Sequence, residues 1–227
     1  MKFLTRGLMV LVFLALVSPA FAAIEVEGDT YINYSSMYLW RGFDLSDGDP
    51  VMQGGMDLSF KGLTLSYWSN YNLDDSELDE TDLVIDYSFD LSELVSLSVG
   101  NILYSINGDD TSEVYAGISL NTILEPAFTI YYDYDQFDGD IYASASIGHS
   151  LDIKDGLSLS LGALASYIDA DGYDALHNAE FSAALDYAFN EQVSLSPAVI
   201  FSTPISDDAD DVIDDEMMAG LTLTLSF

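Results

Sequence analysis

The sequence predicts an all-β protein, a transmembrane antiparallel up-and-down β-barrel of about twelve strands that follows a cleaved signal peptide. Three observations support this prediction. The N-terminus has the parts of an export signal, segments of about ten residues alternate apolar and polar side chains, and the last strand ends in an aromatic residue. Together they favour a protein that crosses a membrane with strands.

The first 22 residues have the composition of a secretory signal peptide. Lys2 and Arg6 form a basic head, Leu8–Val17 is an almost unbroken apolar stretch, and Ala20-Phe21-Ala22 has the small-x-small pattern that signal peptidase recognises. The apolar stretch is shorter than the roughly 20 residues of a membrane-spanning helix. We therefore expect Sec-type export, cleavage after Ala22, and a barrel domain over residues 23–227.

The mature sequence is both strongly acidic and strongly apolar. Without Lys2 and Arg6, only Arg41, Lys61 and Lys154 remain against 39 acidic residues, so that 3 minus 39 gives a net charge of −36. Soluble chains this acidic usually have few aromatic residues, whereas this chain is 13% aromatic and 49% hydrophobic. The two properties are compatible if apolar side chains face lipid and acidic ones face water. Nucleic acid is not an expected partner, because no basic patch is present to displace counterions from phosphates.

Alternation with a period of two recurs along the mature chain. Leu157, Leu159 and Leu161, for example, are separated by small residues, which places the leucines on one face of a sheet. Turn residues separate such segments, a pattern typical of transmembrane barrels. The expected strands are 31–41, 51–60, 63–71, 82–89, 95–105, 113–121, 127–135, 141–150, 157–168, 179–189, 193–203 and 217–227.

The connections between these strands fall into two alternating sets. One set consists of short turns, and two of the three mature basic residues, Lys61 and Lys154, lie in it. The other set, which begins with 42–50, is mostly longer and far more acidic. Bacterial barrels have short periplasmic turns and longer external loops. We therefore expect both termini in the periplasm and the acidic set outside the cell.

The last strand, Leu221–Phe227, alternates apolar residues back from a terminal aromatic one. This ending resembles the signal that the outer-membrane assembly machinery recognises, which makes Phe227 the expected assembly signal and that machinery an expected partner. The implied location is the outer membrane of a Gram-negative bacterium, in contact with lipid and lipopolysaccharide.

Several short motifs stand near the start of the mature chain. They are Tyr38-Leu39-Trp40-Arg41-Gly42, then Pro50 with Gln53-Gly54, then Tyr67-Trp68-Ser69-Asn70. This series resembles the opening of the TorF-type porin family of proteobacteria, although that family more often has Glu at the position of Asp82. The resemblance extends over most of the mature chain and implies an outer-membrane barrel. It says more about location than about the transported solute.

The alternation also assigns faces to the strands. If Tyr38 and Trp40 face lipid, Arg41 points into the lumen. A carboxylate that faces hydrocarbon at mid-depth costs on the order of a few kcal/mol, so strand carboxylates are expected to point inward as well. The candidate pore-lining residues are Arg41, Gln53, Asp57, Asp82, Asp86, Glu113, Asp133, Glu180 and Asp186.

Arg41 is the only evident cation of this acidic lumen. We expect it to form a charge-assisted network with carboxylates such as those of Asp57 and Asp82, either as a structural ion pair or as a selective eyelet. An acidic channel concentrates cations and repels anions. The leading interpretation is therefore a passive channel for small solutes that prefers cations, with a lumen narrower than that of sixteen-stranded porins. The alternative is a closed structural or surface-interaction barrel whose acidic loops contact ions or lipopolysaccharide.

Other chemistry has weaker support in the sequence. The Asp-x-Asp-Gly-x-Asp pattern of Asp169, Asp171 and Asp174 resembles a calcium turn but lacks the rest of an EF-hand loop, and a solvated acidic surface is the alternative. The two histidines, His149 and His177, are expected at the membrane interface or in a loop on opposite sides of the membrane, without a triad motif. We expect neither enzymatic activity nor a cofactor.

Overall fold

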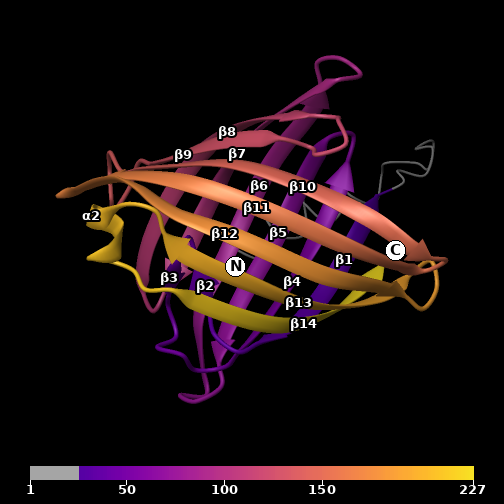
Figure 1. Ribbon diagram of the computed structural model, residues 1–227, viewed down its shortest axis with the longest axis horizontal. Coiled ribbons are helices and arrows are strands. Elements are labelled where there is room, and N and C mark those ends of the chain that lie inside the picture. Colours follow the sequence, from indigo (N-terminus) through magenta and orange to yellow (C-terminus); the bar gives the residue numbers. More distant parts are fainter. Residues whose placement is uncertain (1–25) are drawn as a thin grey trace, which may run out of the picture.

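The computed structural model describes residues 26–227, and twelve of its strands form one closed antiparallel barrel (Figure 1). Each barrel strand pairs with the barrel strands before and after it in the chain, and the first closes the ring against the last. The predicted fold class and strand number are therefore confirmed. The predicted signal peptide and the cleavage site after Ala22 lie outside the described residues.

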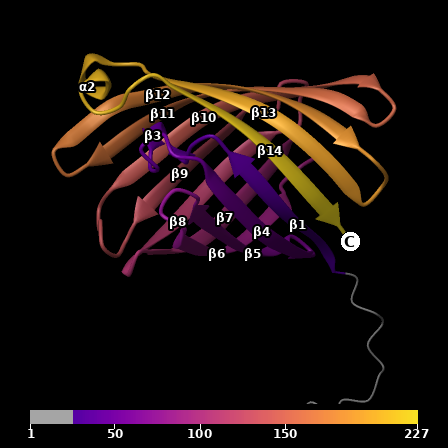
Figure 2. The same ribbon diagram turned by 90° about the horizontal axis from the view of Figure 1, so that it is seen from below.

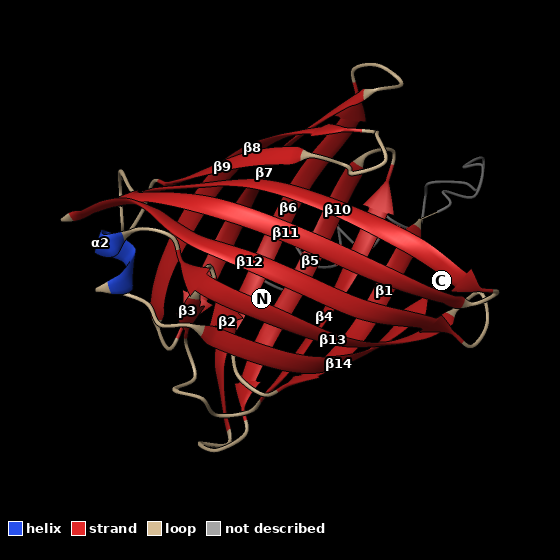
Figure 3. Ribbon diagram, viewed as in Figure 1, coloured by secondary structure: helices blue, strands red, loops and turns tan. Residues whose placement is uncertain are grey.

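The barrel strands carry most of the described chain, and Figure 3 shows how little of it is helical or irregular. They are β1 (Glu27–Ser35), β4 (Val51–Phe60), β5 (Leu63–Asn72), β6 (Glu77–Asp90), β7 (Val95–Ile106), β8 (Asp109–Leu120), β9 (Ala127–Asp133), β10 (Ile141–Lys154), β11 (Leu157–Ala170), β12 (Tyr173–Ala188), β13 (Val193–Pro204) and β14 (Glu216–Ser226). A two-stranded hairpin, β2 (Leu39–Trp40) with β3 (Phe43–Asp44), and the short helix α2 (Asp207–Asp210) lie outside this ladder. Within residues 26–227, no helix has the length and apolar character needed to cross a membrane.

The alternation of the sequence becomes an apolar outer face and a polar inner face. Along β14, exposed and half-buried residues alternate without interruption, and Leu221, Leu223 and Leu225 are each 44–45% exposed. On β6, Leu83 and Ile85 are likewise exposed, and the residues between and beside them are less so. An apolar surface that continues around the whole barrel is far larger than the patches soluble proteins expose. It is the surface that a lipid-facing barrel requires.

The start of β1 and the end of β14 lie side by side at one rim of the barrel, opposite α2 (Figure 2). There the backbones of Phe227 and Gly28 exchange two hydrogen bonds of 2.8 and 2.9 Å, which extends the seam between β14 and β1. The turn between β4 and β5 at this end consists of Lys61 and Gly62, with φ of 51° and 85°. Positive φ at both central residues is what tight hairpin turns with the correct twist require.

At the opposite end, three connections are shorter than the sequence predicted. They comprise only residues 73–76, 107–108 and 171–172, because the adjoining strands extend further. Acidic residues such as Asp110 and Asp174 therefore lie on strands and not in loops. Acidic residues are poor strand formers on average, but here each extension pairs with a neighbouring strand that continues its hydrogen-bond ladder.

The first strand ends earlier than predicted, and this changes the position of the Arg41 motif. β1 ends at Ser35, and residues 36–50 fold back into the barrel, with the β2–β3 hairpin at their centre. Arg41 and Gly42 form its turn, with φ of 51° and 88°. The expectation that Tyr38 and Trp40 face lipid is wrong. Tyr38 is only 6% exposed and its ring lies 5.5 Å from that of the lumen-facing Trp68, because the hairpin is enclosed by the strands.

Candidate functional site

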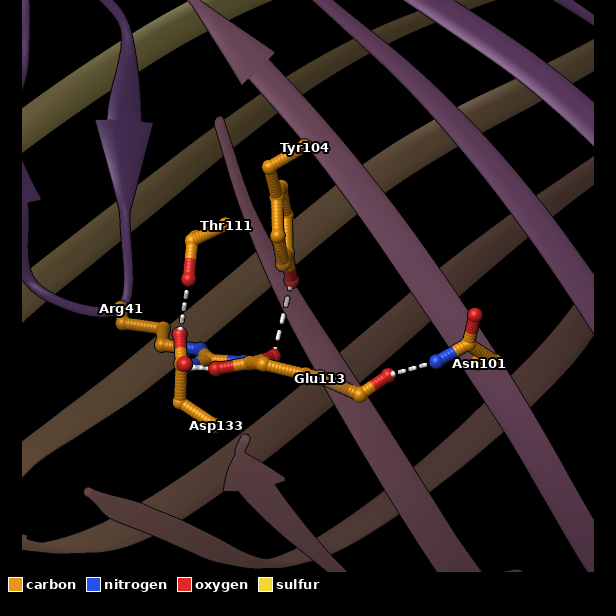
Figure 4. Close-up of polar contacts among 6 residues, drawn as sticks. All are labelled: Arg41, Asn101, Tyr104, Thr111, Glu113 and Asp133. Atoms are coloured by element: carbon orange, nitrogen blue, oxygen red, sulfur yellow. Dashed lines mark hydrogen bonds and ion pairs between the residues drawn. The ribbon is translucent and has the colours of Figure 1, made fainter. Parts of the chain in front are cut away.

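The tip of the inward hairpin is fixed by an ion pair. The Nη1 and Nη2 atoms of Arg41 donate to Oε1 and Oε2 of Glu113 at 2.8 and 2.7 Å (Figure 4). The hydroxyl of Tyr104 donates a further hydrogen bond of 2.9 Å to Glu113 Oε2. The two ionic side chains are 12% and 9% exposed. A bidentate guanidinium–carboxylate pair is among the strongest polar contacts in proteins, and here it neutralises the guanidinium charge.

Three aromatic rings enclose the same guanidinium. Its central carbon lies 4.4 Å from the ring centroid of Trp40, 4.7 Å from that of Tyr131 and 4.3 Å from that of Tyr142. Each ring face attracts the cation through its quadrupole. Tyr115 extends the aromatic wall, with its ring 5.3 Å from that of Tyr131. These contacts place Tyr115, Tyr131 and Tyr142 inside the barrel.

A histidine on β12 holds the backbone of the hairpin tip. Nε2 of His177 lies 2.9 Å from the carbonyl oxygen of Arg41, so Nε2 is the protonated nitrogen that donates. The hydroxyl of Tyr173 then donates to Nδ1 at 2.7 Å, and the ring of Phe43 packs on the imidazole at 4.9 Å. His177 is fully buried. Its expected place at the interface or in a loop is therefore wrong: it is a structural anchor inside the barrel.

Gly42 is required at the tip because the wall approaches it closely. A Cβ atom on Gly42 would lie 2.9 Å from Nδ2 of Asn178, in addition to the unfavourable φ of 88°. Asn178 is itself fixed by Ser202, to which its Nδ2 donates at 2.8 Å, and by a short contact with Ser166. The hairpin tip is thus fitted to β12 by shape as well as by hydrogen bonds.

The motif residues that carry the family resemblance gather around the base of the hairpin. Trp68 contacts Tyr38, Ser69 donates to the carbonyl oxygen of Gly54 at 3.4 Å, and the fully buried Asn70 donates to Asp79 at 2.7 Å. Pro50 and Gln53, which complete the motif, lie just before and within β4. Of these contacts, the one between Trp68 and Tyr38 joins the motif on β5 to the inward segment 36–50.

The predicted partners of Arg41 were Asp57 and Asp82, and this prediction is wrong. At the tip of the hairpin, Arg41 pairs with Glu113 on β8 and with neither of the two predicted carboxylates. Asp82 is 8% exposed, and its Oδ1 has no hydrogen-bond partner within residues 26–227. Asp57 lies on β4 directly opposite Asp29 of β1.

Two predicted pore-lining carboxylates are hydrogen-bonded to hydroxyls of neighbouring strands. Asp86 accepts from Tyr115 at 2.6 Å. Asp186 accepts from Ser160 at 2.6 Å and from Ser196 at 2.7 Å. These bonds hold both carboxylates on the inner wall.

The remaining predicted pore-lining residues are also hydrogen-bonded to neighbouring side chains. Asp133, 3% exposed, accepts from Thr111 at 2.6 Å. Glu180 accepts from Asn178 at 3.0 Å, and Gln53 accepts from Asn33 at 3.2 Å. Whether any of these side chains borders a conducting path stays a prediction.

A cavity of about 610 Å³, which we call the vestibule, lies beside the hairpin at the end of the barrel opposite the termini. Its walls are mainly aromatic and aliphatic, and Arg41 with Glu113 contributes to its floor. Burial raises the pKa of the Asp140 carboxyl in the connection after β9. The nearby charges of Asp133 and Asp171 also raise this pKa, against the lowering effect of a hydrogen bond with the backbone of Asp171. Aromatic residues and carboxylates of its lining include Tyr38, Trp40, Asp79, Glu80, Tyr104, Asp133, Asp140 and Tyr142.

A second cavity, of about 650 Å³, borders the vestibule and is polar. It shares Phe43 and Leu45 of the hairpin with the vestibule, and no Lys or Arg within residues 26–227 lines it. Its carboxylates are those of Asp44, Asp47, Asp49, Asp75, Asp79, Asp214 and Glu216.

The weak calcium candidates do not converge on a site. Asp169 and Asp174 are partners in the β11–β12 ladder, and Asp174 accepts a hydrogen bond from Tyr167 at 2.5 Å. Asp171 lies in the turn between the two strands. Over residues 26–227, no group of three or more His, Asp or Glu side chains is arranged to hold a metal ion.

No protein-family model and no curated protein matches the sequence, so the resemblance to the TorF-type family stays a prediction. Solved structures do match the fold. The KdgM porin is 13% identical with a TM-score of 0.62, over 88% of this chain and 99% of that one. The NanC porin is 11% identical with a TM-score of 0.59, over 88% and 98%. The COG4313 outer membrane channel from Pseudomonas putida F1 is 13% identical with a TM-score of 0.55, over 93% and 100%.

The match extends over nearly the whole length of each of these barrels, while sequence identity is far too low to carry a shared substrate. LpxR from Salmonella typhimurium, 8% identical with a TM-score of 0.53, has a similar barrel too. The chain therefore has the fold of the outer-membrane porin-like barrels.

Proposed function

We propose that the protein is a passive outer-membrane channel for small solutes and that it prefers cations. The observation that carries this proposal is the neutralisation of Arg41 by Glu113. The other basic residues within residues 26–227 lie at the end of the barrel that holds the termini, Lys61 in the turn between β4 and β5 and Lys154 as the last residue of β10. The carboxylates of the inner wall, such as Asp86 and Asp186, therefore dominate the field in the lumen, which raises the local concentration of cations.

The proposed orientation places both termini in the periplasm. At the barrel end that holds the termini, the turns are short and Lys61 and Lys154 lie in or beside them. The opposite end carries the acidic cavity and the longest connections. Short periplasmic turns and longer external loops are general in such barrels. Phe227 serves in this proposal as the assembly signal, and divalent ions between the acidic end and lipopolysaccharide phosphates would compensate the charge outside the cell.

The inward hairpin sets the size limit in this proposal. It fills part of the lumen between β7 and β12, with contacts to Tyr104, Tyr142 and His177. Solutes must pass beside a tip that an ion pair and three ring faces hold in place. One KdgM structure is of a complex with disordered oligogalacturonate, an acidic sugar. The acidic lumen of the present chain would oppose such an anion.

Planar bilayers with purified protein under a KCl gradient test the proposal. A reversal potential displaced toward the potassium equilibrium potential supports it, and one displaced toward that of chloride contradicts it. A barrel that inserts but stays silent at every voltage supports a second function, a closed structural or surface-interaction barrel. The enclosed hairpin with its buried ion pair is the observation that favours this second candidate.

A further inference from the structure

The vestibule has the size of a small-molecule site and unusual walls. Its volume of about 610 Å³ falls in the range of ligand pockets. Four aromatic side chains, those of Tyr38, Trp40, Tyr104 and Tyr142, contribute to its lining. The apolar walls make it a poor place for a fully hydrated inorganic ion, which would lose water against carbon surfaces.

Carboxylates accompany these rings. Asp79, Glu80, Asp133 and Asp140 also line the vestibule, and the only basic lining residue within residues 26–227 is Arg41. Its charge is already compensated by Glu113 at 2.7 Å. The unbalanced charge of the vestibule is therefore negative, and an anionic ligand would be repelled.

The structure itself shows that this wall accepts an organic cation. The guanidinium of Arg41, a delocalised organic cation, lies within 4.7 Å of three ring centroids, and two of those rings, Trp40 and Tyr142, also line the vestibule. Ring faces beside carboxylates are the general arrangement that recognises ammonium and quaternary ammonium groups.

We propose that the vestibule binds small organic monocations that combine an ammonium group with alkyl surface, and that it captures them before passage beside the hairpin. The proposal rests on the proposed function only for the passage step, because binding can be measured without conduction. The aromatic lining provides contact for the alkyl groups, and the carboxylates of Glu80 and Asp140 provide the opposite charge. An uncharged molecule of the same shape lacks both attractions.

Choline and its uncharged isostere 3,3-dimethyl-1-butanol form a matched pair of probes. Trp68→Phe leaves Trp40 as the single tryptophan of the chain, so that quenching of its fluorescence in maltoside detergent reports the vestibule. We expect saturable quenching by choline, about tenfold weaker binding of the isostere, and no binding of galacturonate. Equal affinity for choline and its isostere, or tighter binding of galacturonate, would overturn the proposal.

Two variants test whether the carboxylates of the vestibule are responsible. Asp140→Asn with Glu80→Gln should weaken choline binding about tenfold. Asp174→Asn is the matched control, because Asp174 lies at the same end of the barrel and does not line the vestibule. Because Glu80 is buried, its substitution could disturb folding. Asp140→Asn alone is therefore a second variant, since Asp140 lies in the connection between β9 and β10 and outside the strand ladder. Unchanged choline affinity in Asp140→Asn and in the folded double variant would exclude this site.

Bilayer conductance of the same preparation separates this proposal from the proposed function. A barrel that binds choline and conducts no ions retains the binding site and refutes the channel. A barrel that conducts cations and does not bind choline retains the channel and refutes the site.

Discussion

Arg41 and Glu113 are 72 positions apart in the sequence and form a two-bond ion pair inside the barrel. The pair connects the tip of an inward hairpin to the wall strand β8. It therefore has two consequences, one for the position of the hairpin and one for the charge of the lumen.

Glu113→Gln tests the effect of the pair on charge. The guanidinium of Arg41 would remain in place without a counter-charge, and loss of one partner of a buried pair costs about 3–5 kcal/mol of stability. The reversal potential should shift toward zero and the thermal unfolding midpoint should fall. Asp174→Asn serves as the control, since it also removes one carboxylate. An unchanged reversal potential in the folded variant would show that the lumen charge does not depend on Glu113.

Gly42→Ala tests the fit of the hairpin tip. The new Cβ would lie 2.9 Å from Nδ2 of Asn178, so the tip must move away from β12 and single-channel conductance should rise. Gly48→Ala is a close control, because Gly48 has a similar φ of 79° and nothing lies within 4 Å of its added Cβ. The two variants share the backbone strain and differ in the clash. Equal conductance in both would mean that the tip does not limit the path.

His177→Ala tests the anchor on β12. The carbonyl oxygen of Arg41 would lose its donor and a buried ring would be replaced by a cavity, and losing the hydrogen bond alone costs about 1–3 kcal/mol. Unfolding in urea with detergent should show a lower midpoint than for the unchanged protein. His149→Ala, on β10 toward the end with the termini, should have a smaller effect. A larger loss of stability in His149→Ala would contradict the proposed role of His177.

The strands could be predicted from the sequence because one simple requirement acts on all of them. Each must present apolar side chains to lipid and polar ones to the lumen, and the period of two records that requirement directly, as in Leu221, Leu223 and Leu225. The lengths of the strands beyond the apolar band were less predictable. There, pairing with a neighbouring strand outweighs the low strand propensity of residues such as Asp110.

The hairpin could not be predicted from alternation alone. Tyr38 and Trp40 continue the period of β1, and a lipid-facing strand would look the same. The available signal was Ser35-Ser36 as a break, followed by Arg41-Gly42 as a two-residue turn. The partners of the tip, Glu113 and His177, become neighbours only when the barrel closes, which no local pattern records.

Charged thiol reagents would test the acidic lumen most directly, because the chain contains no cysteine and a single one can be introduced cleanly. Asp86→Cys places a thiol on the inner wall beside Tyr115, and Asp171→Cys places one in the exposed turn between β11 and β12. Cationic and anionic methanethiosulfonates would be compared at both positions. The account predicts that the ratio of cationic to anionic rates is at least about tenfold higher at position 86 than at position 171. Equal ratios at the two positions, or faster reaction of the anionic reagent at position 86, would contradict it.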